Sequence, residues 1–155
     1  MTEEEKEKLG DILAHQLEGL MFHFDSMLMY KLFGMEKMAK LHCHQHREES
    51  DNLIATHMNI ISEKDMVIHP SKFDKKVVFA INEKPSPLMI ESFSKKAMAM
   101  WKEWEEETLT MYREMAQIFT ELKVFKKLCK STEKEIRSMS SACKLLANEL
   151  KSKNL

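Results

Sequence analysis

The chain has 155 residues, of which 43% are hydrophobic and 32% charged, and its formal net charge is -1. It contains 3 glycines and 3 prolines, where average usage would give roughly 11 and about 8. All-β folds and glycine-rich nucleotide-binding loops are therefore excluded, because they need frequent turns or clustered glycines. The balanced charge predicts no nucleic-acid partner, and the absence of a long apolar run predicts no membrane partner.

The amino terminus and the cysteines indicate the compartment. The opening residues, MTEEEKEK, are acidic and polar, unlike a secretory signal. Cys43, Cys129 and Cys143 are odd in number and form no CxxC pair. We therefore expect a cytoplasmic protein without a disulfide framework.

The prolines divide the chain into two halves. Pro70, Pro85 and Pro87 lie close together, with 69 residues before Pro70 and 68 after Pro87 that include no proline. Because proline is excluded from helix interiors, each half is expected to form two long helices. The predicted helices cover residues 4–32, 35–63, 87–119 and 123–151, and the predicted crossover covers 64–86 with a short extended segment at 77–81.

The lengths of the connections predict the topology. Gly34 follows an apolar stripe and predicts the first break, and a turn is expected around 120–124. Short links join antiparallel helix pairs, whereas the long crossover makes the second and third helices parallel. The predicted fold is an all-α, up-down-down-up four-helix bundle forming one domain over 1–155, and one long crossover is the ferritin-like arrangement.

A rotation of about 100° per residue predicts which side chains face the core. In the 4–32 helix the expected inward residues are Leu9, Leu13, Leu17, Leu20, Phe24, Met27 and Leu28. Met21, Phe22 and Met29 lie off this stripe, which indicates a second buried surface, most simply a subunit contact. In the 87–119 helix the expected inward residues include Trp101 and Trp104.

The 35–63 helix carries polar residues in the middle of its apolar stripe. His42, His46 and Glu49 are spaced at i, i+4 and i+7 and so point the same way. Buried imidazoles and a carboxylate are costly unless they are paired or bind a metal. Neighbouring helices could add polar ligands, namely Gln16, Glu105 and Glu135.

Two interpretations of this helix remain open. In one, the histidines form a solvated turn and Glu49 is ion-paired to a neighbouring helix. In the other, Glu49 and at least one histidine bind a metal ion, and converging carboxylates and imidazoles are how helix bundles build iron sites. There is no ExxH pair and no recognisable nucleophile motif, so enzymatic activity is uncertain and a hydrolase is not expected.

The segment from Gly34 to Asn52 resembles the stretch of ferritins and bacterioferritins that leads into their second helix. In this resemblance Glu49 falls on the ferroxidase glutamate, but Asn52 stands where the family has a histidine. Trp101 stands where a glutamate is expected in the third helix. Gln16 takes the place of the first glutamate, with Glu18 as a near miss that points to solvent or an interface, and Glu135 falls near a fourth-helix position that is often Gln or Glu.

The resemblance implies a ferritin-like iron-binding or iron-storage subunit with a degenerate ferroxidase centre. Such a subunit would assemble with itself or with related subunits into an oligomeric shell, and its ferroxidase activity would be weak or absent because Trp101 would fill the di-iron cavity. Two other hypotheses remain. In the first, His42, His46 and Glu49 form an altered site for a divalent metal such as Zn(II), Cu(II) or iron. In the second, the chain is a metal-free helical scaffold that binds a partner.

Overall fold

The computed structural model describes residues 1–73 and 84–155, and all its regular elements are helices. They are α1 (Glu3–Leu32), α2 (Glu36–Lys64), α3 (Pro87–Ile118) and α4 (Val124–Ser152). The predicted all-α fold is confirmed, and each predicted helix boundary lies within a residue or so of the observed one. The extended segment predicted at 77–81 lies outside the described residues.

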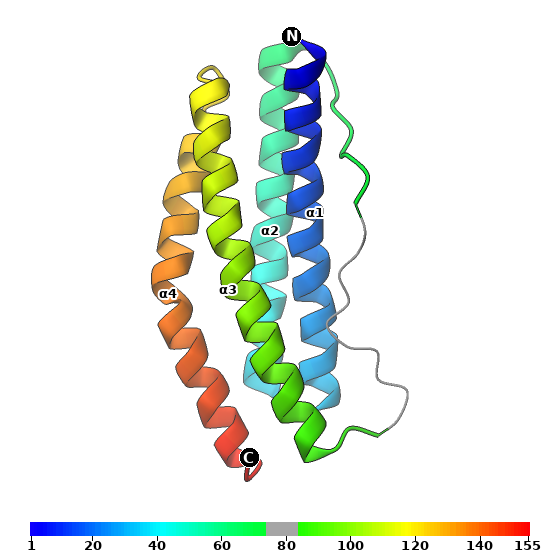
Figure 1. Cartoon of the computed structure of the whole chain (residues 1–155), viewed down its shortest axis with the longest axis vertical. Coiled ribbons are helices and arrows are strands. Elements are labelled where there is room, and N and C mark those ends of the chain that lie inside the picture. Colours follow the sequence, from blue (N-terminus) through cyan, green and yellow to red (C-terminus); the bar gives the residue numbers. More distant parts are fainter. Residues whose placement is uncertain (74–83) are drawn as a thin grey trace.

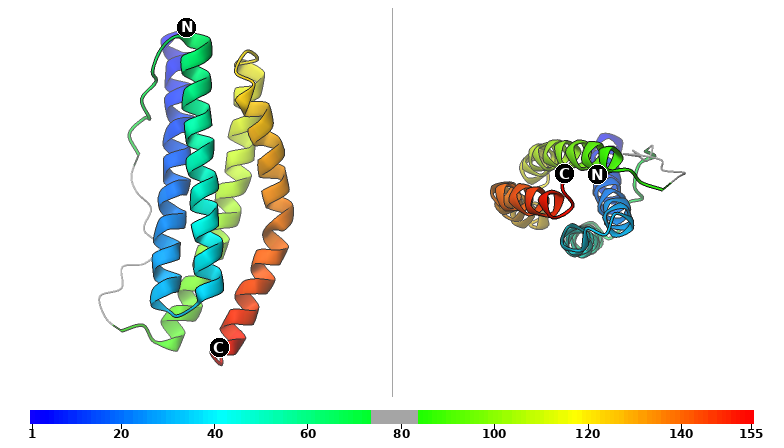
Figure 2. Two further views of the ribbon diagram at one scale, coloured as in Figure 1. Left: turned by 180° about the vertical axis from the view of Figure 1, so that it is seen from behind. Right: turned by 90° about the horizontal axis from the view of Figure 1, so that it is seen from below.

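The helices form a bundle in which each helix contacts two others (Figure 1). α1 packs against α2 and α3, and α4 packs against the same two helices. α1 and α4 run in one direction and α2 and α3 in the other, so every contacting pair is antiparallel, as the long crossover predicts. The end-on view in Figure 2 places the four helices around a common axis. This topology leaves a long central interior to which all four helices contribute.

Local signals in the sequence account for the starts of α1 and α3 and for the α1–α2 link, whereas a residue of α2 caps the start of α4. The side chain of Thr2 accepts a hydrogen bond from the Glu5 backbone N–H, and Ser86 caps α3 in the same way ahead of Pro87. Gly34 has a φ of +71°, which favours glycine and makes the tight link between α1 and α2 possible. The turn before α4 has no glycine, and there Asn59 of α2 accepts a hydrogen bond from the Val124 backbone N–H at 3.1 Å.

The bundle interior has two apolar clusters with a polar layer between them. One cluster, near the α1–α2 turn, includes Phe33, Met38 and Phe93. The other, near the α3–α4 turn, includes Leu9 and Phe125. The polar layer consists of buried side chains from all four helices: His15, Gln16, His23, His42, Gln45, Glu49, Thr56, Glu105, Thr108 and Thr132. Burying this many polar groups is costly unless they bind one another or a ligand, so the layer is where a functional site is expected.

The structure corrects the predicted orientation of α1. Phe24 and Leu28, predicted to face inward, are 43% and 50% exposed, whereas Phe22, predicted to lie off the core, is buried within it. The close packing of α1 on α3 explains this rotation. A Cβ at Gly19 would lie 2.1 Å from the Trp104 ring, so only glycine lets the indole rest against α1 there.

The same rotation changes which part of α1 is exposed. Leu17, Leu20, Met21 and Met29 are all half-buried, and Met29 packs against the core cluster. Two residues of the predicted second buried surface, Phe22 and Met29, therefore pack against the core of this chain itself. No helix in the described ranges combines the length and the apolar character needed to cross a membrane.

Candidate metal centre

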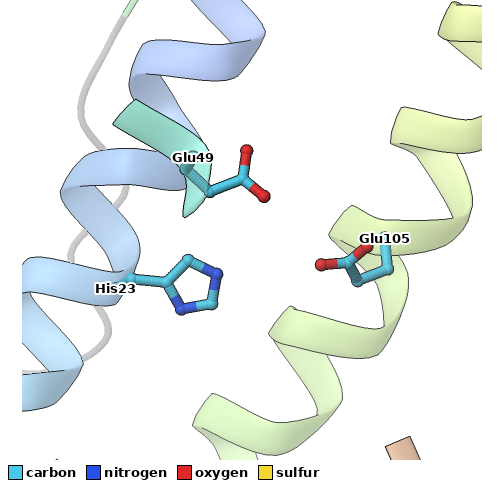
Figure 3. Close-up of side chains that lie close together, drawn as sticks. All are labelled: His23, Glu49 and Glu105. Atoms are coloured by element: carbon cyan, nitrogen blue, oxygen red, sulfur yellow. The ribbon is translucent and has the colours of Figure 1, made fainter. Parts of the chain in front are cut away.

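Three buried side chains converge in the polar layer (Figure 3). His23 comes from α1, Glu49 from α2 and Glu105 from α3, and one ligand atom of each lies within 4.8 Å of the other two. All three residues are almost completely buried, with between 0% and 6% of their surface exposed. The group could hold a metal ion, because one imidazole and two carboxylates are a common donor set for divalent metals.

Two atoms of this group have no hydrogen-bond partner although they are buried: His23 Nε2 and Glu49 Oε2. The other ring nitrogen of His23, Nδ1, lies 2.9 Å from Nδ1 of His42, so one of the two donates a hydrogen bond to the other. This contact leaves Nε2 of His23 as the candidate ligand atom. Unpaired buried polar atoms are rare in proteins, and here two of them belong to residues whose ligand atoms lie close enough for one ion to reach both.

Burial controls the protonation of the group. Burial lowers the pKa of His23 well below its ordinary value, and the neighbouring His42 and His46 lower it further. Neutral imidazole is the form that binds metals. Burial is the main cause that raises the pKa of Glu49 well above its ordinary value, and the charges of Glu105 and Glu135 raise it further. Burial also raises the pKa of Glu105 to about 7, and the hydrogen bond from Trp101 opposes this.

Aromatic side chains enclose the group on one side. Trp101 Nε1 donates a hydrogen bond to Glu105 Oε1 at 3.2 Å, and the Trp101 ring meets His23 edge-on at a centroid distance of 5.3 Å. His42 stacks on Tyr30 at 5.4 Å. Burial lowers the pKa of His42 to about 3, so it is neutral and suited to orient His23. A partner on the far ring nitrogen of a histidine in this way fixes its tautomer and the direction of its ligand atom.

The structure brings two of the six sequence-predicted ligands, Glu49 and Glu105, into this group. His42 is not part of the group, but it contacts His23 through its Nδ1 atom. His46 instead lies with its Nδ1 atom 3.1 Å from the Leu20 carbonyl oxygen, and its ring is close to Phe24 on the outer side of α1. His46 therefore belongs to the α1–α2 contact.

The other two predicted ligands lie near the group but outside it. Gln16 donates hydrogen bonds to Thr56 Oγ1 at 2.9 Å and to Tyr112 Oη at 3.0 Å. Glu135 accepts a hydrogen bond from Gln45 Nε2 at 3.0 Å. Burial, followed by contact with the Glu48 carboxyl, raises the pKa of Glu135 to about 7.

His23 is the residue that the sequence analysis missed. It lies seven residues after Gln16, which is two helical turns, and seven before Tyr30. All three are buried. This polar i, i+7 series was a usable signal, but the leucine and phenylalanine residues of α1 predicted a different inward face.

Comparison of the chain with protein-family models gave no match, and comparison with curated proteins gave none either. The assignment of the site therefore depends on its own geometry.

Proposed function

We propose that this protein is a ferritin-like, iron-binding subunit that holds a single divalent iron ion at His23, Glu49 and Glu105. The observation that carries the proposal is the pair of partnerless buried atoms, His23 Nε2 and Glu49 Oε2, within a group whose ligand atoms lie within 4.8 Å of one another. A metal ion satisfies both atoms at once. Three protein ligands leave positions for water or a small molecule.

Trp101 supports one metal rather than two. Its indole is 2% exposed and lies against both Glu105 and His23. It therefore fills space beside the group, and it has no atom that binds iron. Two-metal oxidase sites need two ions roughly 3.5–4 Å apart, so we propose weak or absent ferroxidase activity and a role in binding or storing iron.

Exposed apolar side chains support the proposal that the chain assembles with copies of itself or with related subunits. Phe24, Leu28 and Leu32 of α1 are between 43% and 57% exposed, and Ile54 and Met58 of α2 are 57% and 60% exposed. Apolar surface of this kind commonly marks a protein interface. The three cysteines are free and half-buried, which suits the proposed reducing, cytoplasmic location.

Anaerobic titration with Fe(II) tests the metal site. Wild-type protein should bind one ion tightly per chain, and binding at a hundredfold excess over Kd should stabilise the fold by about 2.7 kcal/mol. Glu49→Gln and His23→Ala should weaken binding at least about tenfold, whereas His46→Ala serves as the matched control and should bind normally. Equal binding by wild-type protein and both site variants would refute the proposal.

Two further measurements separate the alternatives. Elemental analysis of protein purified from iron-supplemented cells should find iron; zinc or copper alone would favour a different divalent-metal site, and no metal would favour a scaffold. Light scattering should give the mass of an oligomer, and a monomer at working concentration would contradict assembly into a shell.

A further inference from the structure

The outer face of α4 carries a continuous row of positive charge. The helix has seven basic and three acidic residues, although the whole chain has a net charge of -1. A rotation of about 100° per residue places the basic side chains on the side opposite the buried residues of this helix. Together with the residue that precedes the helix they form the basic stripe, and all are exposed: Lys123, Lys126, Lys127, Lys130, Lys134, Arg137, Lys144 and Lys151.

The carboxylates of α4 do not offset this charge, because each one faces a neighbouring helix. Glu133 pairs with Arg113 of α3 at 3.4 Å. Glu135 and Glu149 accept hydrogen bonds from residues of α2. Within the described part of the chain, no side chain of the basic stripe forms an ion pair. The stripe is therefore available to a partner of opposite charge.

The composition of the stripe indicates the kind of partner. None of the exposed large hydrophobic side chains in the described ranges lies on α4. A protein partner would bury an apolar core, and a helix that lies on a membrane needs an apolar face to insert, whereas the apolar face of α4 packs inside the bundle.

Polar side chains complete the stripe. Ser141 and Asn148 are exposed and occupy the gaps between Arg137, Lys144 and Lys151, at spacings of three or four residues that keep them on one helix face. Lysine, arginine, serine and asparagine are all side chains that bind the phosphate oxygens of nucleic acids. The stripe thus combines positive charge with hydrogen-bond donors and lacks apolar contacts.

We propose that the basic stripe binds the phosphate backbone of a double-stranded nucleic acid without reading its sequence. From Lys123 to Lys151 the stripe extends about 42 Å at 1.5 Å per residue, slightly more than one turn of a B-form duplex, which is about 34–36 Å. Contacts to phosphate carry no sequence information. Net charge, which predicted no nucleic-acid partner, averages over the whole chain and hides charge that is confined to one helix face.

The location of the stripe leaves it uncovered in the proposed assembly. α4 lies diagonally across the bundle from α1 (Figure 2) and does not pack against it. The exposed apolar side chains of α1 therefore lie on a different side of the molecule. The inference is also independent of the proposed metal centre, because none of the metal ligands belongs to the stripe.

Fluorescence anisotropy of a labelled DNA duplex of about 30 base pairs, or three helical turns, tests the proposal. Metal-free wild-type protein should bind at about 50 mM salt and lose about a thousandfold in affinity by about 200 mM, as expected for roughly six phosphate contacts. The stripe variant Lys130→Gln/Lys134→Gln/Arg137→Gln should bind at least about tenfold more weakly at the lower salt concentration. Its slope of log affinity against log salt should be smaller by about three.

The control variant Lys37→Gln/Lys40→Gln/Arg47→Gln removes the same three charges from the exposed side of α2, and it should keep the wild-type affinity and slope. Circular dichroism checks folding, and Lys130→Gln/Arg137→Gln replaces the stripe variant if that variant is unfolded. No duplex binding by wild-type protein, or an equal loss in the stripe and control variants, would overturn the proposal.

Two further measurements separate other partners. Binding of wild-type protein to phosphatidylserine vesicles in place of the duplex would assign the stripe to a membrane surface. Light scattering that finds a salt-sensitive oligomer, lost in the stripe variant and formed in place of duplex binding, would assign it to a second copy of this chain. Either result would overturn the nucleic-acid proposal.

Discussion

The buried carboxyl group of Glu105 should make the stability of the metal-free protein depend on pH. Its pKa is raised from an ordinary 4.5 to about 7 in the folded chain. Between these values the folded state binds a proton that the unfolded state has lost, so the free energy of unfolding falls as pH rises. Integrated over this shift, the Glu105 contribution is roughly 2–3 kcal/mol smaller at pH 8 than at pH 5.

The matched variant is Glu105→Gln, whose side-chain oxygen can still accept the hydrogen bond from Trp101 but cannot titrate. His23 and His42 have lowered pKa values and contribute the opposite pH dependence, because acid favours the unfolded state in which they bind protons. Their contribution is shared by wild-type protein and the variant, so it cancels in the difference. The Glu105 charge also raises the pKa of Glu49, so the difference reports Glu105 together with its interaction with Glu49.

Urea denaturation of metal-free protein at pH 5 and pH 8 measures the effect, with both proteins treated with chelator. Relative to Glu105→Gln, the wild-type protein should lose roughly 2–3 kcal/mol of unfolding free energy between pH 5 and pH 8. This loss is equivalent to a Tm decrease of about 5–10 °C for a chain of this size. Parallel pH profiles for the two proteins would show that Glu105 titrates normally and is not enclosed as described. A profile of the opposite sign would show that an unrecognised cation holds it ionised.

The remaining predictions concern binding, packing and capping. Fe(II) affinity should fall about tenfold from pH 8 to pH 6, because protons compete for Glu105; calorimetry showing no pH dependence would argue against carboxylate ligands. Gly19→Ala should destabilise the protein by about 1–3 kcal/mol, because the added methyl meets Trp104, and an unchanged urea midpoint would contradict that contact. Asn59→Ala should cost about 1 kcal/mol by leaving the Val124 N–H without its cap, as thermal unfolding can verify.

The candidate site was only partly predictable from the sequence. Glu49 shares one helical stripe of α2 with Met38 and Ile60, so helical periodicity predicted that it faces the interior, and Glu105 was expected on the facing helix. His23 was missed because α1 has apolar residues on two faces, and periodicity cannot choose between them. His46 shares the helical spacing of His42 and Glu49, but it lies at the edge of the inward-facing stripe of α2. There it contacts α1 and does not reach the interior.

The sequence alone determined the helix count, the helix boundaries and the connection order of this protein. These follow from local chemistry, since proline, Gly34 and the capping residues act on the backbone within a few positions. Tertiary structure decided which face of α1 is buried and which ligands meet. That choice depends on contacts between residues far apart in the chain, such as Gly19 with the Trp104 ring, and on the shared interior in which His23, Glu49 and Glu105 converge.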